Sequence, residues 1–124
     1  MSLTNKLTDF FNKSEARKDK DNVLIVSIFF ITQEHGWISS QKDFGEDDHF
    51  VEYKKPGGIV LTTRGARKGG KFDLVFEAQG RAKVKDSIVL DMDEFVTEDL
   101  QVINEDLLRV KLGSLLTSLD NRLM

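Results

Sequence analysis

The sequence predicts an α+β fold in a single domain, residues 1–124: a twisted antiparallel sheet of five or six strands, an N-terminal helix and one or two C-terminal helices. Three observations predict it. Short β-branched and aromatic runs alternate with turn signals, and six of the nine glycines lie between residues 57 and 80, which is typical of a meander of short strands. Helical apolar spacing appears near both ends of the chain. A chain of 124 residues is also long enough to bury one core without disulfides.

The N-terminal third is predicted to contain a helix, a linker and the first strand. Residues 3–15 place Leu3, Leu7 and two phenylalanines on one side of a short amphipathic helix. Residues 15–22 are polar and are predicted as a linker or an exposed helix end. Residues 23–32 form a nearly unbroken β-branched and aromatic run, which predicts a central strand covered on both faces.

The middle of the chain is predicted to supply the rest of the sheet. A second strand begins at Trp37 and Ile38. Loops are predicted where the chain is polar or rich in glycine, over residues 41–49 and 65–70. Apolar and polar residues alternate between these loops, as in half-buried strands. The strands predicted from this pattern cover residues 50–54, 59–63, 71–78 and 81–90.

The C-terminal segment changes to helical spacing. Residues 95–102 are compatible with a short helix, and residues 105–122 predict a long one with an acidic first turn. Six leucines at spacings of three and four form one side of it. Gly113 within this helix costs about 1 kcal/mol relative to alanine, and residues 106–112 also fit a strand.

Composition excludes several classes of protein. The chain has no cysteine, so it has no disulfide, no thiol nucleophile and no thiolate metal site. Its longest apolar run, residues 23–31, is too short to cross a bilayer as a helix, and the N-terminus lacks the apolar core of a signal peptide. We expect a cytoplasmic protein that requires no cofactor.

Charge is sharply divided along the sequence. Residues 54–85 contain nine bases and only two acids, Asp73 and Glu77, whereas residues 86–106 contain eight acids and no base. Such a division can hold an anionic partner, or it can pair with itself or with a second copy. Solvated charges that protect a sheet edge are the alternative interpretation.

From this pattern we predict a small non-enzymatic binding module whose glycine-rich basic hairpins contact an anionic partner. Single-stranded nucleic acid is the leading candidate, because basic side chains bind phosphates and nearby aromatic rings stack on bases. Tyr53 and Phe76 lie near the basic residues as further aromatic side chains. The predicted nucleic-acid-binding residues are Arg64, Arg67, Lys68, Lys71, Phe72, Arg81 and Lys83.

The order of elements in this region resembles that of PUR-type single-strand-binding domains. The resemblance covers about 30 residues: the strand at residues 69–74, the strand at residues 87–90 and the acidic helix start at residues 93–95. Those domains place a curved antiparallel sheet before a helix and dimerise through it. The resemblance therefore implies single-strand binding by a dimer.

Two metal-dependent alternatives have less support. Asp43, Glu52 and Lys54 are similar to the PD-(D/E)xK nuclease core, in which two carboxylates hold Mg²⁺ and the lysine helps to activate water. A surface ion pair on a strand explains the same residues. The acidic run at residues 46–49, together with His35, matches no known metal-binding loop and is predicted to be solvated.

A protein-interaction or assembly function, such as that of a secretion-chaperone-like dimer or a subunit of a phage or other complex, is the second hypothesis. The two terminal helices carry large apolar faces, which include Phe10, Phe11 and the leucines of residues 108–123. Either both helices cover the sheet of one chain, or one of them packs on a second copy. We expect a homodimer formed through a terminal helix.

Overall fold

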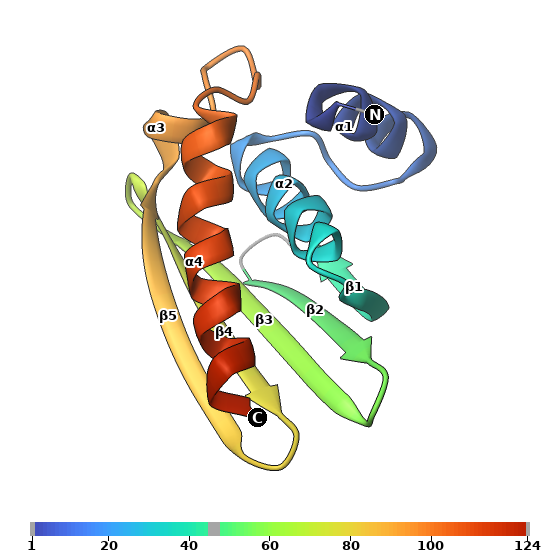
Figure 1. Ribbon diagram of the computed structural model, residues 1–124. Helices are drawn as coiled ribbons and strands as arrows, with labels where there is room; N and C mark the ends of the chain where they lie inside the picture. The colour runs from blue at the N-terminus through green and yellow to red at the C-terminus, as the bar shows by residue number, and fades with distance from the viewer. Residues whose placement is uncertain (1, 45–47, 124) are drawn as a thin grey trace.

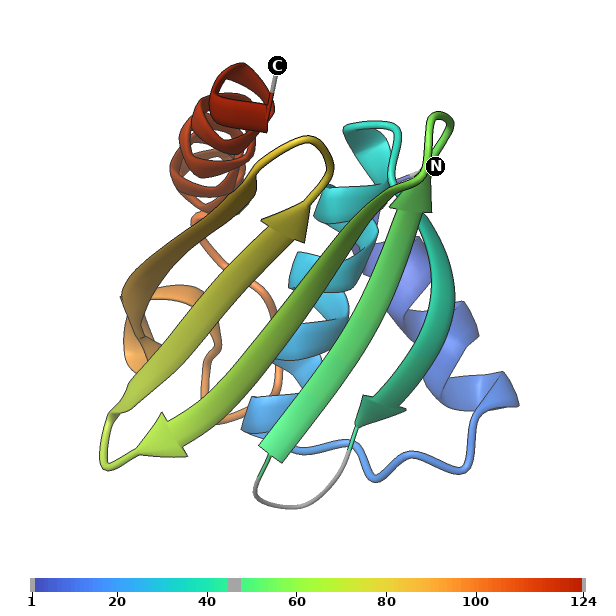
Figure 2. The ribbon, with the colours of Figure 1, turned by 90° about the horizontal axis from the view of Figure 1, so that it is seen from below.

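The computed structural model describes residues 2–44 and 48–123, and it confirms the α+β fold class (Figure 1). Five antiparallel strands lie side by side in sequence order, and the helices of the described chain cover one face of the sheet (Figure 2). In the part of the chain that the structure describes, the opposite face carries no helix. The strands are β1 (Ile38–Phe44), β2 (Asp48–Lys55), β3 (Ile59–Lys68), β4 (Lys71–Gln79) and β5 (Lys83–Asp91).

Three of the four described helices form the covering layer. In Figure 1, α2 (Lys20–Glu34) lies between α1 (Leu3–Lys13) and α4 (Glu105–Leu123). The Ser2 side chain caps α1 by accepting a hydrogen bond from the Asn5 amide at 3.2 Å. The predicted terminal helices are confirmed, and the strand alternative for residues 106–112 is wrong.

The predicted central strand at residues 23–32 is wrong, because these residues form the helix α2. Ten of its fifteen residues are buried, on every side of the helix, since α2 packs against the sheet, α1 and α4. A helix surrounded in this way has apolar residues at all positions, so the sequence shows no helical period. The Asp19 side chain accepts a hydrogen bond from the Asn22 amide at 2.9 Å and starts the helix within the predicted linker.

Several predicted boundaries also change. Residues 41–44 belong to β1, residues 48–49 belong to β2, and residues 45–47 of the predicted loop lie outside the described residues. Strand β3 continues through residues 65–68, so the basic loop shrinks to a turn at Gly69 and Gly70. The short helix α3 (Met92–Phe95) ends at Phe95, and Val96 then forms a bridge with Val102 in place of the predicted helix.

The core lies between the sheet and the three long helices. Inward-pointing residues of β2, β3 and β4 alternate with exposed ones, as half-buried strands require. All six leucines of α4 at positions 108, 112, 115, 116, 119 and 123 are buried against this sheet and α2. The leucine seam is therefore buried by other parts of the same chain and is not available for an interface.

Close packing at Gly65 joins the sheet to α2. A Cβ atom at Gly65 would lie 2.5 Å from the Phe72 ring and 3.3 Å from Ile25 Cδ1. Phe72 and Ile25 are both fully buried, so neither has room to move away. The absence of a side chain at Gly65 is what lets the Phe72 ring lie flat beneath α2.

Replacing Gly65 with alanine should therefore destabilise the protein by about 1–3 kcal/mol through overpacking. Gly70→Ala is the control, because no atom lies within 4 Å of a Cβ there; it should change the free energy of unfolding by less than about 0.5 kcal/mol. Urea unfolding of both variants measures the difference. Equal stability of the two variants would contradict the packing argument.

Candidate functional site

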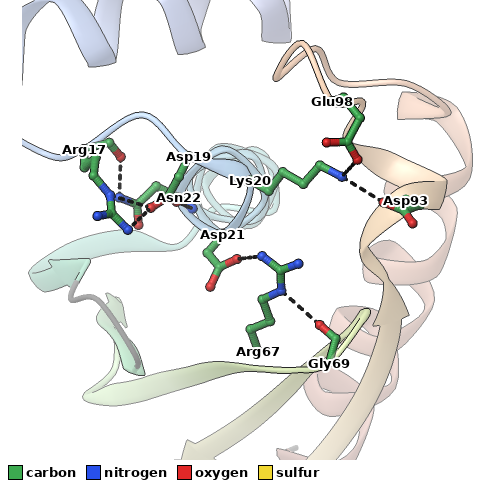
Figure 3. Close-up of polar contacts among 9 residues, drawn as sticks. All are labelled: Arg17, Asp19, Lys20, Asp21, Asn22, Arg67, Gly69, Asp93 and Glu98. Carbon is green, nitrogen blue, oxygen red and sulfur yellow. Dashed lines mark hydrogen bonds and ion pairs between the residues drawn. The ribbon is translucent and has the colours of Figure 1, made fainter.

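The predicted basic residues divide between the two faces of the sheet. Along β3, Arg64 and Lys68 point to the uncovered face, whereas Arg67 points toward the helices. Arg67 Nη1 lies 3.2 Å from the Asp21 carboxylate of α2, and its Nε donates to the Gly69 carbonyl at 2.9 Å (Figure 3). Arg67 thus ties the tip of the β3–β4 hairpin to α2 and does not extend the basic surface of Arg64.

Most of the other predicted bases are already paired with acids. The nitrogen–oxygen distances are 3.1 Å for Lys68–Asp73, 3.2 Å for Lys71–Asp91 and 3.1 Å for Lys83–Glu77. These pairs are largely exposed, so each contributes at most a fraction of a kcal/mol to stability. They nevertheless leave only three of the six predicted bases, Arg64, Arg67 and Arg81, outside such pairs on the sheet.

Arg64 and Arg81 have no carboxylate partner among the described residues. The Arg64 guanidinium carbon lies 4.9 Å from the centroid of the Phe50 ring, in a cation–π contact on the uncovered face. Beside this pair is a hollow of about 360 Å³ whose lining includes Ala66 and Val75. Arg64 keeps its hydrogen-bond donors available there.

Phe72 cannot stack on a base, so its assignment to the binding site is a correction. The ring is completely buried on the helix-covered face, as are Tyr53 and Phe76. Alternation along β2 and β4 sends these three aromatic residues into the core. The half-buried Phe50 is the aromatic residue that stands beside a basic side chain on the uncovered face, and the sequence interpretation did not select it.

The uncovered face is balanced in charge. Strand alternation and register place bases and acids in equal numbers on its five strands. The bases are Lys54, Arg64, Lys68, Lys71, Lys83 and Lys85, and the acids are Asp43, Asp48, Glu52, Asp73, Glu77 and Asp91.

The acidic segment is neutralised mainly by bases from elsewhere in the chain. Lys20 of α2 contacts Asp93 at 2.9 Å and Glu98 at 2.5 Å (Figure 3). Hydrogen bonds to Glu98 and Asp93 raise the pKa of Lys20. Asp86 pairs with Arg122 at 2.9 Å. Lys71–Asp91 is the one ion pair that joins the basic and acidic segments in the described chain.

A second ionic cluster fastens α4 to α2. Arg109 Nη2 lies 2.8 Å from Glu34 Oε1, and its other amino group contacts Glu105. The hydrogen bond from Arg109 lowers the pKa of Glu34. These three charged residues thus form ion pairs that stabilise the fold, and they do not indicate a binding surface.

The nuclease interpretation remains a prediction. Glu52 and Lys54 do share the uncovered face, but Glu52 Oε1 accepts a hydrogen bond from Ser40 Oγ at 2.8 Å. Residues 46–47 of the acidic run lie outside the described residues. In residues 2–44 and 48–123, no three His, Asp or Glu side chains come together in a way that could hold a metal ion.

A groove between α1 and β1 was not predicted. It has a volume of about 810 Å³, and its apolar wall consists of Phe10, Phe30 and Phe44, none of which is fully buried. Phe10 meets the other two rings edge-to-face, with centroids 6.3 Å and 5.7 Å away. One sequence signal was available: five of the nine phenylalanines lie in the first 44 residues.

Two lysines at the rim of this groove rest on aromatic rings. Lys6 Nζ lies 5.8 Å from the Phe30 centroid, and Lys42 Nζ lies 5.1 Å from the Phe29 centroid. Neither has a carboxylate partner among the described residues. Lys13, also at the rim, is paired with Asp9 at 3.2 Å. Lys6 and Lys42 are therefore free to meet an acidic group next to an apolar one.

His49 is a buried titratable group on the helix-covered face. It is 1% exposed, its ring stacks on Phe72 at a centroid distance of 6.0 Å, and neither ring nitrogen has a hydrogen-bond partner in the described chain. Burial lowers the pKa of His49, and this effect outweighs the opposing influence of the nearby carboxylates Asp19, Asp21, Asp43 and Asp48. The imidazole is thus held neutral inside the core.

Comparison with protein-family models, curated proteins and solved structures finds no match to this chain. The resemblance to PUR-type domains gains no support from it. Among the described residues, no helix is both long and apolar enough to span a membrane.

The neutral, buried His49 predicts a loss of stability in mild acid. Its folded pKa lies below the value of about 6.5 expected when unfolded, so the unfolded chain takes up a proton first as the pH falls. The free energy of unfolding should be constant above that pH and decrease below it, by up to about 1.4 kcal/mol per pH unit. Urea unfolding between pH 7.5 and 5.5 measures this decrease.

His49→Phe keeps a planar ring and should flatten the pH dependence. His35→Gln replaces the only other histidine and is the control. If the wild type and His49→Phe lose stability equally over this range, His49 is not the group responsible.

Proposed function

We propose that this protein is a non-enzymatic protein-interaction module that binds an apolar segment of a partner protein in the groove between α1 and β1. The observation that carries the proposal is the wall of incompletely buried phenylalanines, Phe10, Phe30 and Phe44, around a hollow of about 810 Å³. Partly exposed aromatic side chains in a concave site are frequent anchors of protein–protein binding.

The edge strand β1 is poorly suited to pairing with a strand of another protein. We therefore expect a partner to bind through side-chain contacts in the groove. Lys42 is a charged residue that points toward the helices, and the register of β1 with β2 shifts between Ser39 and Gln41. Inward-pointing charges and bulges are the devices by which sheet edges resist a further strand. A partner therefore reaches the phenylalanines beside β1 without extending the sheet.

The rim indicates the chemistry of the partner. Lys6 and Lys42 line the groove beside aromatic rings and have no carboxylate partner among the described residues, although Asp9, Glu15 and Asp43 line the groove as well. An apolar side chain flanked by Asp or Glu fits both the wall and these two cations. Cations at the rim also disfavour basic segments through like-charge repulsion.

A random-peptide display library tests the proposal. Peptides selected on the wild-type protein should contain an aromatic or large aliphatic residue next to an acid. The Phe10→Gln variant should bind these peptides at least about tenfold more weakly, which is the loss of about 1.4 kcal/mol expected for an anchor contact. Fluorescence anisotropy with labelled peptides measures the affinity.

Phe50→Gln is the matched control, because Phe50 is also a partly exposed phenylalanine but lies on the uncovered face of the sheet. It should leave peptide affinity unchanged. The proposal fails if no peptide is enriched, or if the enriched peptides bind both variants with equal affinity.

Single-stranded nucleic acid remains the second candidate, and one observation favours it. Arg64 lies over Phe50 beside the hollow of about 360 Å³ on the uncovered face. Arginine planes and aromatic rings both stack on unpaired bases, and the guanidinium also binds phosphate. The balanced charge of that face and the burial of Phe72 place this candidate second.

For nucleic acid, the decisive measurement is the salt dependence of oligonucleotide binding. Arg64→Gln should weaken binding to single-stranded DNA and reduce the slope of log K against log salt by about 0.7, the value for one lost phosphate contact. Arg67→Gln is the control, because Arg67 is bound to Asp21 on the other side of the sheet. Absence of binding by the wild type at about 50 mM salt would reject this candidate.

A further inference from the structure

The solvent-facing side of α4 concentrates exposed apolar surface. The described chain has five large hydrophobic residues that are more than a third exposed, and three of them occur within eight positions: Ile103 (38%), Leu107 (41%) and Val110 (63%). Leu107 and Val110 lie in the first two turns of α4, and Ile103 lies two residues before the helix begins. They are separate from the buried leucine seam of the same helix.

A second seam continues from these residues along the helix. Leu107 and Val110 are followed at steps of four, three and four by Ser114, Thr117 and Asn121, all exposed. This alternation of three and four is the spacing by which one helix packs along another. A helix that only covers a sheet needs one apolar seam, and α4 already has it in its leucines.

The two halves of this face differ in shape. Beyond Val110, the small residues Gly113, Ser114, Thr117 and Ser118 border a shallow hollow of about 670 Å³. The protruding apolar residues and the hollow thus lie on the same side of one helix, one after the other. Such a face is complementary to itself when a second copy runs in the opposite direction.

We propose that α4 packs antiparallel against α4 of a second copy, with the two helices crossing near Ser114. Leu107 and Val110 of each copy then cover the hollow of the other, and the small residues at the crossing let the helix axes approach closely. In the same arrangement, Asp106 lies opposite Arg122 of the second copy. Asp106 has no ion partner among the described residues, and Arg122, which is paired with Asp86 within its own chain, is 44% exposed and can contact a second carboxylate.

The expected dimer is weak. A helix of 19 residues is about 28 Å long, so the contact buries less than the roughly 800 Å² per partner of a standard stable interface. We therefore expect a dissociation constant on the order of micromolar. The surface is independent of the peptide groove, because α1 and α4 lie on opposite sides of α2 (Figure 1).

Sedimentation of paired variants tests the interface. Val110→Glu should raise the dissociation constant at least tenfold. Val89→Glu is the control, because Val89 is also an exposed valine (58% against 63%) but lies on β5. Both positions are exposed, so both variants should keep the circular dichroism spectrum of the wild type. A monomeric wild type at high micromolar concentration, or equal effects of the two changes, would overturn the proposal.

Single-cysteine variants test the geometry, and the absence of native cysteine makes them unambiguous. Ser114→Cys should form a disulfide-linked dimer under mild oxidation, because position 114 faces its own copy at the crossing point. Val89→Cys should not. Leu107→Cys should also stay monomeric, since antiparallel copies separate these residues by about 21 Å along the helix. Cross-linking at position 107 would overturn the antiparallel arrangement, and its absence at position 114 would overturn the interface.

Discussion

Burial of α2 is the constraint on which the rest of the structure depends. Ten of its fifteen residues are inaccessible to solvent, on all sides of the helix, so α2 needs cover from more than the sheet beneath it. Helix α1 supplies this cover on one side and α4 on the other (Figure 1). Because α2 takes the middle of the sheet, α1 lies at the β1 edge, where the phenylalanine groove forms. The same arrangement leaves one side of α4 in solvent.

The fold class could be predicted from the sequence because one face of the sheet is exposed. Its strands therefore alternate apolar and polar residues, and residues typical of turns separate them. The central helix could not be predicted, because a helix buried on all sides has apolar residues at nearly every position and therefore shows no helical period. Residues 23–32 are apolar at nearly every position, and a run without period fits a buried strand as well as a buried helix. The length and the capping residue distinguish the helix from a strand. Asp19 caps the N-terminus of the helix, and a segment of fifteen residues is longer than a typical strand.

The candidate site could be predicted only in part, for a different reason. The sequence identified the charged residues, but it could not supply the partners of Arg67 and Lys20, which lie far away along the chain. Asp21 and Arg67 are 46 residues apart, and Lys20 and Glu98 are 78 apart. Phe72 was misassigned although its strand was predicted, because the sequence alone did not show which face of that strand would be covered by helices; the face of Phe72, Leu74 and Phe76 is the buried one.

The division of charge along the sequence is therefore not a division of charge in space. The acids of residues 86–106 meet Lys20, Arg109 and Arg122, all of which lie outside the basic segment. The bases of β3 to β5 instead stand among acids on the uncovered face. An antiparallel sheet with mixed charges can face water without a covering layer, so that face requires no partner to explain its exposure. Among the described residues, Ile38 and Val89 are exposed singly on the sheet, whereas apolar surface gathers at the α1–β1 groove and on the outer side of α4. Gathered apolar surfaces of this kind are the places where contacts with other proteins replace solvent most favourably.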